Sequence, residues 1–163
     1  MPLTLDVLLA REEITDVIKR LARATDRLDE EAMAGCYHPD GFDDHNAFRG
    51  SGREFARWVM GALAHFTATM HFIGPPYVVV DGESAHADTY CVAHHLRAAD
   101  DLIIGLRYVD RFARRAGTWL IAKRVCAFDW TYTVPVDQAT RWQFADDFTV
   151  GVRDRTDITY RGV

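Results

Sequence analysis

The sequence predicts an α+β domain in which three helices pack on one face of a strongly curved, mostly antiparallel sheet that encloses a pocket. Two observations support this class. Apolar residues recur at helical spacing through about the first 66 residues, and from Thr69 onward the period changes to two in segments rich in Val, Ile, Tyr, Trp and Thr. The strands follow one another without intervening helices, which argues against alternating βαβ units.

The helical part divides into three segments. Residues 4–27 carry apolar side chains at three- and four-residue intervals behind Thr4, a helix-start residue, and predict a first helix that ends near Leu28. Residues 29–37 predict a short second helix. The turn sequence His38-Pro39-Asp40-Gly41 then predicts a chain reversal. Residues 53–66 predict a third helix, which Ser51 would cap.

The second part of the chain is predicted to form long antiparallel hairpins. Its segments are rich in β-branched and aromatic residues, and short turn sequences such as Asp81-Gly82 separate them. In the last strand, we expect Arg124 to interrupt an inward face of Leu120, Ala122, Cys126, Phe128 and Trp130. The predicted strands cover residues 77–80, 85–97, 102–114 and 118–133.

Length and composition indicate one domain with a substantial core. The chain has 163 residues, of which 48% are hydrophobic and 12% aromatic. We place the core over about residues 8–135 and a charged tail over 136–163. The tail would pack over the mouth of a cavity or against a neighbouring subunit. Three distant cysteines, Cys36, Cys91 and Cys126, are expected to be free and mostly buried.

Charge argues against two classes of partner. The net charge is -5, and the 19 lysines and arginines are scattered among acidic residues. No basic stripe for nucleic acid or an anionic membrane is present. The sequence also lacks a cationic segment followed by an apolar run, and no stretch approaches the roughly 20 apolar residues needed to span a bilayer. We therefore expect a soluble, cytoplasmic protein.

Three ionisable residues stand where the pattern expects apolar ones. Asp26 follows the apolar series at the end of the first helix, His71 lies between Met70 and Phe72, and Arg124 interrupts a buried strand face. Charged groups rarely occupy an apolar face without a partner or a function. A shared cavity would explain all three.

These residue types fit proton transfer. Imidazole has an ordinary pKa of about 6.5, so His71 suits a general base, and a carboxylate such as Asp26 could fix its tautomer. Arg124 could stabilise a leaving group or an oxyanion. Structural interpretations remain open: His71 as a core histidine bonded to a backbone carbonyl, Asp26 as a helix-end charge, and Arg124 in a buried ion pair with Asp26 or Asp129. Asp129 has the opposite strand parity to Arg124 and should point away from the cavity.

Several motifs resemble a known family. The sequences Arg107-Tyr-Val-Asp-Arg-Phe112, Gly117-Thr-Trp119 and Phe128-Asp-Trp130 follow the predicted order of helices and hairpins. Together they resemble the SnoaL-like branch of the nuclear transport factor two (NTF2) superfamily over about residues 8–135. The resemblance implies a cone-shaped fold. Within the superfamily, the chain is similar to γ-hexachlorocyclohexane dehydrochlorinase, scytalone dehydratase and bile-acid 7α-dehydratase, which eliminate water or HCl.

The resemblance also implies roles for individual residues. Asp26 and His71 would form a catalytic pair with the histidine as base, and Arg124 would be an active-site arginine. His94, in the run His94-His-Leu-Arg97, would have a water-handling role. Strand alternation allows only one of His94 and His95 to face the pocket, and the neighbouring residues leave open which. Thr25 and His45 stand where scytalone dehydratase has tyrosines. We expect substrate contacts from five residues: His45, Phe55, Trp58, Phe128 and Trp130.

The sequence therefore predicts a cofactor-independent lyase, a dehydratase or dehydrohalogenase, for a small hydrophobic cyclic molecule. Two alternatives stay open: an isomerase or polyketide cyclase that moves a proton in the same pocket, and a non-catalytic binding module. No metal-ligand spacing or phosphate-binding loop is present, so we expect neither a metal nor a cofactor. The resemblance further implies a homo-oligomer, with a trimer favoured over a dimer.

Overall fold

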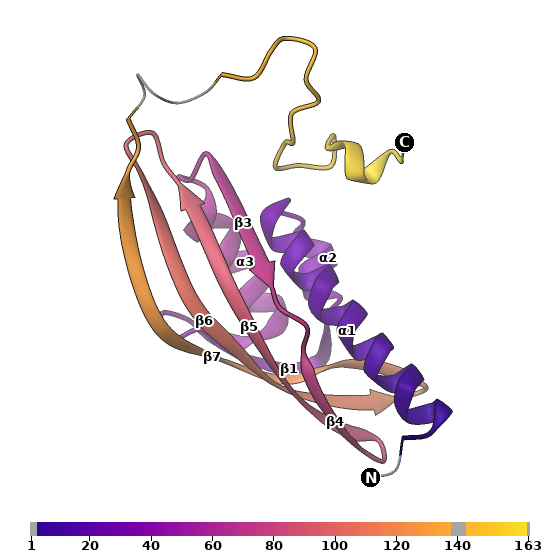
Figure 1. Cartoon of the computed structure of the whole chain (residues 1–163). Helices are drawn as coiled ribbons and strands as arrows, with labels where there is room; N and C mark the ends of the chain where they lie inside the picture. Colours follow the sequence, from indigo (N-terminus) through magenta and orange to yellow (C-terminus); the bar gives the residue numbers. More distant parts are fainter. Residues whose placement is uncertain (1–2, 138–142, 163) are drawn as a thin grey trace.

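The computed structural model describes residues 3–137 and 143–162, and within them it has the predicted α+β architecture. Figure 1 shows the helices on one side of a long, strongly curved sheet. The helices are α1 (Leu5–Asp26), α2 (Glu30–Ala34), α3 (Gly52–Leu63) and a short 3-10 helix, η1 (Ile158–Tyr160). The strands are β1 (Tyr37–Asp44), β2 (Arg49–Ser51), β3 (Ala68–Ile73), β4 (Tyr77–Asp81), β5 (Ser84–Leu96), β6 (Asp100–Arg115) and β7 (Thr118–Pro135).

The sheet is mostly antiparallel, as predicted. Its strand order is β2-β1-β7-β6-β5-β3, and β4 pairs with the first half of β5 while β3 pairs with the second half. The pairing of β1 with β7 is parallel. The sheet is not closed, and its concave face is covered by α1 and α3, which produces a cone (Figure 1).

The helix ends follow the sequence signals closely. The Thr4 side chain accepts a hydrogen bond from the Val7 backbone N–H at the start of α1. Ser51 and Glu54 form a reciprocal capping box at the start of α3. The inward face of α1 is fully buried against the sheet and supplies much of the core, with Ile14, Val17, Ile18 and Leu21 each at most 2% exposed.

The structure corrects the prediction around residues 37–51. The second helix ends at Ala34, and the predicted turn at residues 38–41 lies inside β1. The pairing of β1 with β7 shifts between Tyr37 and Phe42, so the turn sequence makes an irregularity within a strand. Gly41 is required there because an added Cβ would lie 2.7 Å from the Ile121 carbonyl oxygen.

Two register shifts also change the faces of β7. One lies near Ala122, where Arg111 pairs with Lys123 and Phe112 pairs with Ile121. The predicted inward face is therefore wrong before this shift, where Trp119 and Ile121 are buried in place of Leu120 and Ala122. The predicted inward face is correct from Arg124 to Phe128. The second register shift lies between Phe128 and Trp130.

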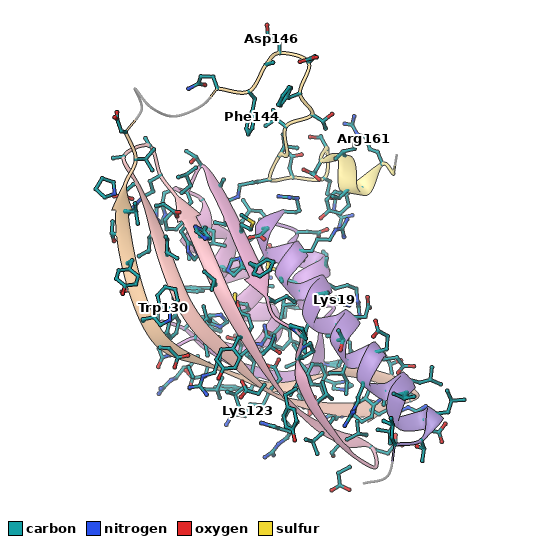
Figure 2. All side chains as sticks on the ribbon, viewed as in Figure 1. Lys19, Lys123, Trp130, Phe144, Asp146 and Arg161 are labelled. Carbon is teal, nitrogen blue, oxygen red and sulfur yellow. The ribbon has the colours of Figure 1, made fainter. Side chains whose placement is uncertain are left out.

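The described part of the tail packs against the helices. Asp29, which follows α1, accepts hydrogen bonds from Arg155 (2.8 Å) and Tyr160 (2.9 Å). Arg153 donates to the backbone oxygen of Leu63, the last residue of α3, and to that of Phe66, which follows the helix. Figure 2 shows Phe144, Asp146 and Arg161 beyond the upper ends of the strands. Residues 138–142 of the predicted tail lie outside the described residues.

The three cysteines are free and buried, as predicted. Among the described helices, none combines the length and apolar character required to cross a bilayer.

Candidate functional site

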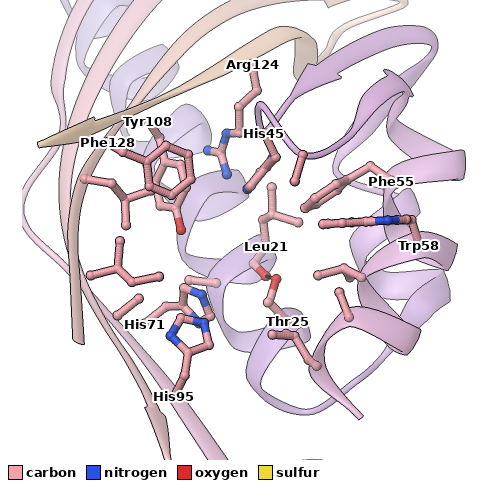
Figure 3. A pocket seen from close by; sticks show the side chains of 18 residues that line it. Leu21, Thr25, His45, Phe55, Trp58, His71, His95, Tyr108, Arg124 and Phe128 are labelled. Atoms are coloured by element: carbon pink, nitrogen blue, oxygen red, sulfur yellow. Dashed lines mark hydrogen bonds between the residues drawn. The ribbon is translucent and has the colours of Figure 1, made fainter. Parts of the chain in front are cut away.

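A cavity of about 200 Å³ lies between α1, α3 and the concave face of the sheet. Most of its wall is aliphatic or aromatic. Figure 3 shows His71 and His95 toward one end and His45 and Arg124 toward the other, with Leu21 and Thr25 between them. The polar residues that line it are Thr25, His45, His71, His95, Tyr108 and Arg124.

Asp26 and His71 form a hydrogen-bonded pair at the first end. Asp26 is the last residue of α1, and His71 lies on β3, which packs beside this helix. The His71 Nδ1 atom lies 2.7 Å from Asp26 Oδ1, and the His71 backbone N–H donates to Asp26 Oδ2 over 2.9 Å. The Thr69 hydroxyl donates to Oδ1 over 2.9 Å. The side chains are only 14% and 9% exposed.

These hydrogen bonds favour the ionised form of Asp26. Burial raises the pKa of Asp26, but the hydrogen bonds and charge of His71, together with Thr69, outweigh burial and lower the pKa below its usual range. An ionised carboxylate only accepts hydrogen bonds, so the hydrogen in this bond lies on His71 Nδ1. The other ring nitrogen, Nε2, makes no hydrogen bond to Asp26 and belongs to a side chain that lines the cavity.

His95, and not His94, faces the cavity. The His95 ring lies edge-on to His71 with ring centroids 5.5 Å apart. Its Nδ1 atom is buried without a hydrogen-bond partner, and burial, together with the charge of His71, lowers its pKa to about 4. His94 points to the other face of β5 and pairs with Asp101 over 2.7 Å. Strand alternation left open which of the two histidines faces the pocket, and the structure gives this position to His95.

Arg124 lines the cavity and is paired with Asp110. Its Nε and Nη2 atoms each donate to one carboxylate oxygen over 2.7 Å, and both residues are at most 3% exposed. Burial lowers the pKa of Arg124, but Asp110 outweighs this and raises it well above its usual value. The guanidinium also lies over the Tyr108 ring at 4.1 Å. The buried ion pair left open for Arg124 is present, but its partner is neither Asp26 nor Asp129: Asp26 pairs with His71, and Asp129 pairs with Arg107 on the face away from the cavity.

Sequence reasoning missed Asp110 and Asp43. Asp110 lies on the inward face of β6 between Tyr108 and Phe112, and Asp43 is fully buried on β1. The strand register places Asp43, Arg124 and Asp110 in one row across β1, β7 and β6. An acidic residue at an inward position of an alternating strand was a usable signal for Asp110. Asp43 gave no such signal, because its strand was not predicted.

Four of the five residues that were expected to contact the substrate line the cavity. These are His45, Phe55, Trp58 and Phe128. Trp130 does not, because the second register shift in β7 falls between Phe128 and Trp130 and reverses its face. Its indole lies over Gly105, where an added Cβ would come within 2.1 Å of the ring. The prediction for Trp130 is therefore wrong.

Within residues 3–137 and 143–162, no three His, Cys, Asp or Glu side chains meet in a group that could hold an ion.

The profile of the SnoaL-like domain family matches residues 6–125. A hexachlorocyclohexane dehydrochlorinase from Novosphingobium barchaimii superposes with a TM-score of 0.71 at 17% identity, covering 82% of this chain and 94% of its own. A protein of unknown function from Mycobacterium tuberculosis superposes with a TM-score of 0.69 at 26% identity, covering 76% and 74%. An NTF2-like protein with a cystatin-like fold from Novosphingobium aromaticivorans gives 0.65 at 26%, covering 76% and 84%. No match is found among curated proteins.

Proposed function

The chain belongs to the SnoaL-like domain family, and from this premise we propose that it is a cofactor-independent lyase, a dehydratase or dehydrohalogenase. Its substrate is a small, largely apolar cyclic molecule. The observation that carries the proposal is the Asp26–His71 pair beside a largely apolar cavity. The dehydrochlorinase among the superposed structures catalyses an elimination by name, which agrees with this reaction class.

In the proposed reaction, His71 is the general base. Its Nε2 atom takes a proton from a substrate carbon next to an activating group, and Asp26 holds the ring by Nδ1 and stabilises the imidazolium that forms. His95 is kept neutral by its lowered pKa. A second cation therefore does not oppose the charge that develops on His71.

In the proposed reaction Arg124 acts as a hydrogen-bond donor, and not as an unpaired positive charge. Asp110 neutralises the guanidinium and uses Nε and Nη2. The Nη1 group remains as a directed hydrogen-bond donor on a cavity-lining side chain. We assign it to the leaving group or to an oxygen that becomes negative in the transition state, where such donors are worth about 3–4 kcal/mol.

The size and lining of the cavity support the substrate class. A volume of about 200 Å³ and a wall that includes Leu21, Phe55 and Phe128 fit a compact apolar ring better than a long chain. In line with the chain's composition, we also propose a cytoplasmic location and the absence of nucleic-acid or membrane partners.

Product analysis tests the function. We expect proton NMR in D2O to detect an unsaturated product, with release of water or chloride, from a panel of cyclic β-hydroxy and β-chloro ketones. His71→Gln should lower the rate by about 10²- to 10⁴-fold because it removes the base. His94→Gln is the matched control: this histidine also pairs with an aspartate, but outside the cavity.

The same spectra separate the alternatives. Deuterium incorporation or double-bond migration without loss of a group would favour an isomerase, since the same base serves that reaction. If a compound of the panel binds but shows neither elimination nor deuterium exchange, this result would contradict the proposed enzymatic activity and favour a binding module.

A further inference from the structure

A second carboxylate–imidazole pair lies at the end of the cavity away from His71. The His45 Nδ1 atom is hydrogen-bonded to Asp43 Oδ1, and the Tyr37 hydroxyl donates to Asp43 Oδ2 over 2.5 Å. The His45 ring lines the cavity and stacks on Phe55, with ring centroids 4.3 Å apart and planes 19° from parallel. The carboxylate and the stacked ring thus fix the orientation of this imidazole as firmly as Asp26 fixes His71.

The buried row beside His45 contains more acidic groups than basic ones. The row across β1, β7 and β6 contains two carboxylates, Asp43 and Asp110, and one guanidinium, Arg124, each at most 3% exposed. A buried cluster with more carboxylates than cations is costly, so a hydrogen bond from the His45 ring to Asp43 stabilises it. The groups that face this cluster from the packed elements are Tyr37 and Asp43 on β1, Cys126 and Arg124 on β7, and Tyr108 and Asp110 on β6.

The free nitrogen of His45 has a weak partner. Its Nε2 atom lies 3.1 Å from the Cys126 sulfur. Burial raises the pKa of the Cys126 thiol well above its usual value, so the sulfur stays protonated and is a poor hydrogen-bond acceptor. A substrate oxygen in the cavity is a better acceptor than this sulfur and would replace it.

We propose that His45, positioned by Asp43, is a second proton-transfer residue, which donates a proton to the leaving group while His71 acts as base at the other end of the cavity. This inference rests on the lyase activity proposed above and adds the acid that elimination of water requires. Figure 3 shows the two imidazoles at opposite ends of the cavity, so a substrate that fills it would meet both.

The proton balance of this step is complete. His71 Nε2 takes the proton from carbon, and the C–H electron pair becomes the new C=C bond. The C–O bond breaks toward oxygen, which takes the proton from His45 Nε2 and leaves as water. His71 then loses a proton to solvent and His45 gains one, so the net change is loss of one water molecule from the substrate.

The first test compares two leaving groups. Hydroxide must be protonated to leave, whereas chloride is stable as an anion. With β-hydroxycyclohexanone as probe, we expect His45→Gln to lower kcat/KM by about 100-fold, and with β-chlorocyclohexanone by less than about 3-fold. His71→Gln should impair both reactions, and His94→Gln neither. Equal losses with both probes in His45→Gln would overturn the proposal.

A second test needs no turnover, so it separates this proposal from the proposed function. Nitrogen NMR of 15N-histidine-labelled protein should show His45 as an imidazolium near neutral pH. In Asp43→Asn, the same residue should lose its proton at lower pH, while the fold and the His94 signals stay unchanged. A neutral His45 near neutral pH in the unaltered protein would overturn the proposal, whether or not either probe is turned over. Failure of both probes with an imidazolium at His45 would count against the lyase activity alone.

Discussion

At the scale of single residues, the cavity separates three histidines by their partners. His71 and His45 each have a carboxylate on Nδ1, whereas His95 has a buried Nδ1 without a partner. A carboxylate stabilises the protonated ring, and burial without a partner stabilises the neutral one. Burial without a partner therefore sets His95 apart, because it lowers the pKa of this ring to about 4.

Because of His95, the free energy of unfolding should decrease as the pH falls. Its pKa falls from 6.5 unfolded to about 4 folded, so between these values the unfolded chain binds more protons. The contribution of His95 to stability is fully present above pH 6.5 and is lost as pH falls toward 4. We expect urea midpoints to fall across this window less steeply in His95→Gln than in the unaltered protein. An identical slope in His95→Gln and in the His94→Gln control would contradict this account.

Only part of the site could be predicted from residue patterns. Asp26 and His71 could be selected from local sequence, since Asp26 ends the apolar helix α1 and His71 stands between Met70 and Phe72, although these two neighbours point to the opposite face of β3. The partner of Arg124 depends on which residue of β6 lies opposite it, and that register comes from tertiary pairing. Trp130 could not be placed because one register shift reverses every later side chain.

At the scale of elements, the unusual feature of the sheet is the buried row of Asp43, Arg124 and Asp110 across β1, β7 and β6. Strand pairing places Asp110 opposite Arg124 with two parallel hydrogen bonds, and both are removed from water. A buried pair of this kind costs desolvation, so its presence contributes more to the arrangement of the cavity wall than to net stability.

Breaking this pair should be more harmful than removing it. Arg124→Met leaves Asp110 as an unpaired buried carboxylate, which should cost about 3–5 kcal/mol in the free energy of unfolding. Adding Asp110→Leu should recover most of this loss, because both charges are then absent. Urea denaturation of the two single variants and the double variant measures the coupling. Additive losses would contradict the pairing.

The parallel contact between β1 and β7 depends on Gly41. A Cβ at this position would lie 2.7 Å from the Ile121 oxygen and 2.9 Å from the His38 oxygen, both backbone atoms. Gly41→Ala should therefore cost about 1–3 kcal/mol through overpacking. Gly61→Ala is the control: it lies in α3 with no atom within 4 Å of the added Cβ, and should be neutral or stabilising. Equal unfolding free energies for the two variants would be inconsistent with this close approach.

At the scale of the whole molecule, the order of helices and hairpins could be read from the change of hydrophobic period. The sequence did not reveal β1 and β2, because Pro39, Asp40 and Gly41 have the composition of a turn. Only the pairing with β7 shows that these turn-type residues form an irregular segment within a strand. The order of helices and hairpins therefore follows from local pattern, whereas the addition of β1 and β2 to the edge of the sheet depends on tertiary contacts.

The outer face of the sheet leaves large apolar side chains in water. Met70 and Phe72 on β3 and Tyr90 on β5 are 56%, 69% and 67% exposed. Since such patches on soluble proteins often mark interfaces, we propose a homo-oligomer, a trimer first, that covers this face.

Light scattering tests the assembly. We expect a mass above that of the 18.5 kDa monomer, and we expect Phe72→Glu combined with Tyr90→Glu to reduce it to the monomer mass. Leu8→Glu, on an exposed position of α1, should leave the assembly intact. An unaltered protein that is already monomeric would refute the proposal.

The central claim is that Asp26 and His71 act as one base, and a double-mutant cycle of kcat/KM tests it most directly. Asp26→Asn and His71→Gln should each lower kcat/KM for elimination, by about 10²- to 10⁴-fold for the histidine, and the double variant should be little worse than His71→Gln alone. This non-additivity is expected because the carboxylate acts only through the imidazole to which it is bonded. Losses that simply multiply in the double variant, or full activity in His71→Gln, would contradict the account.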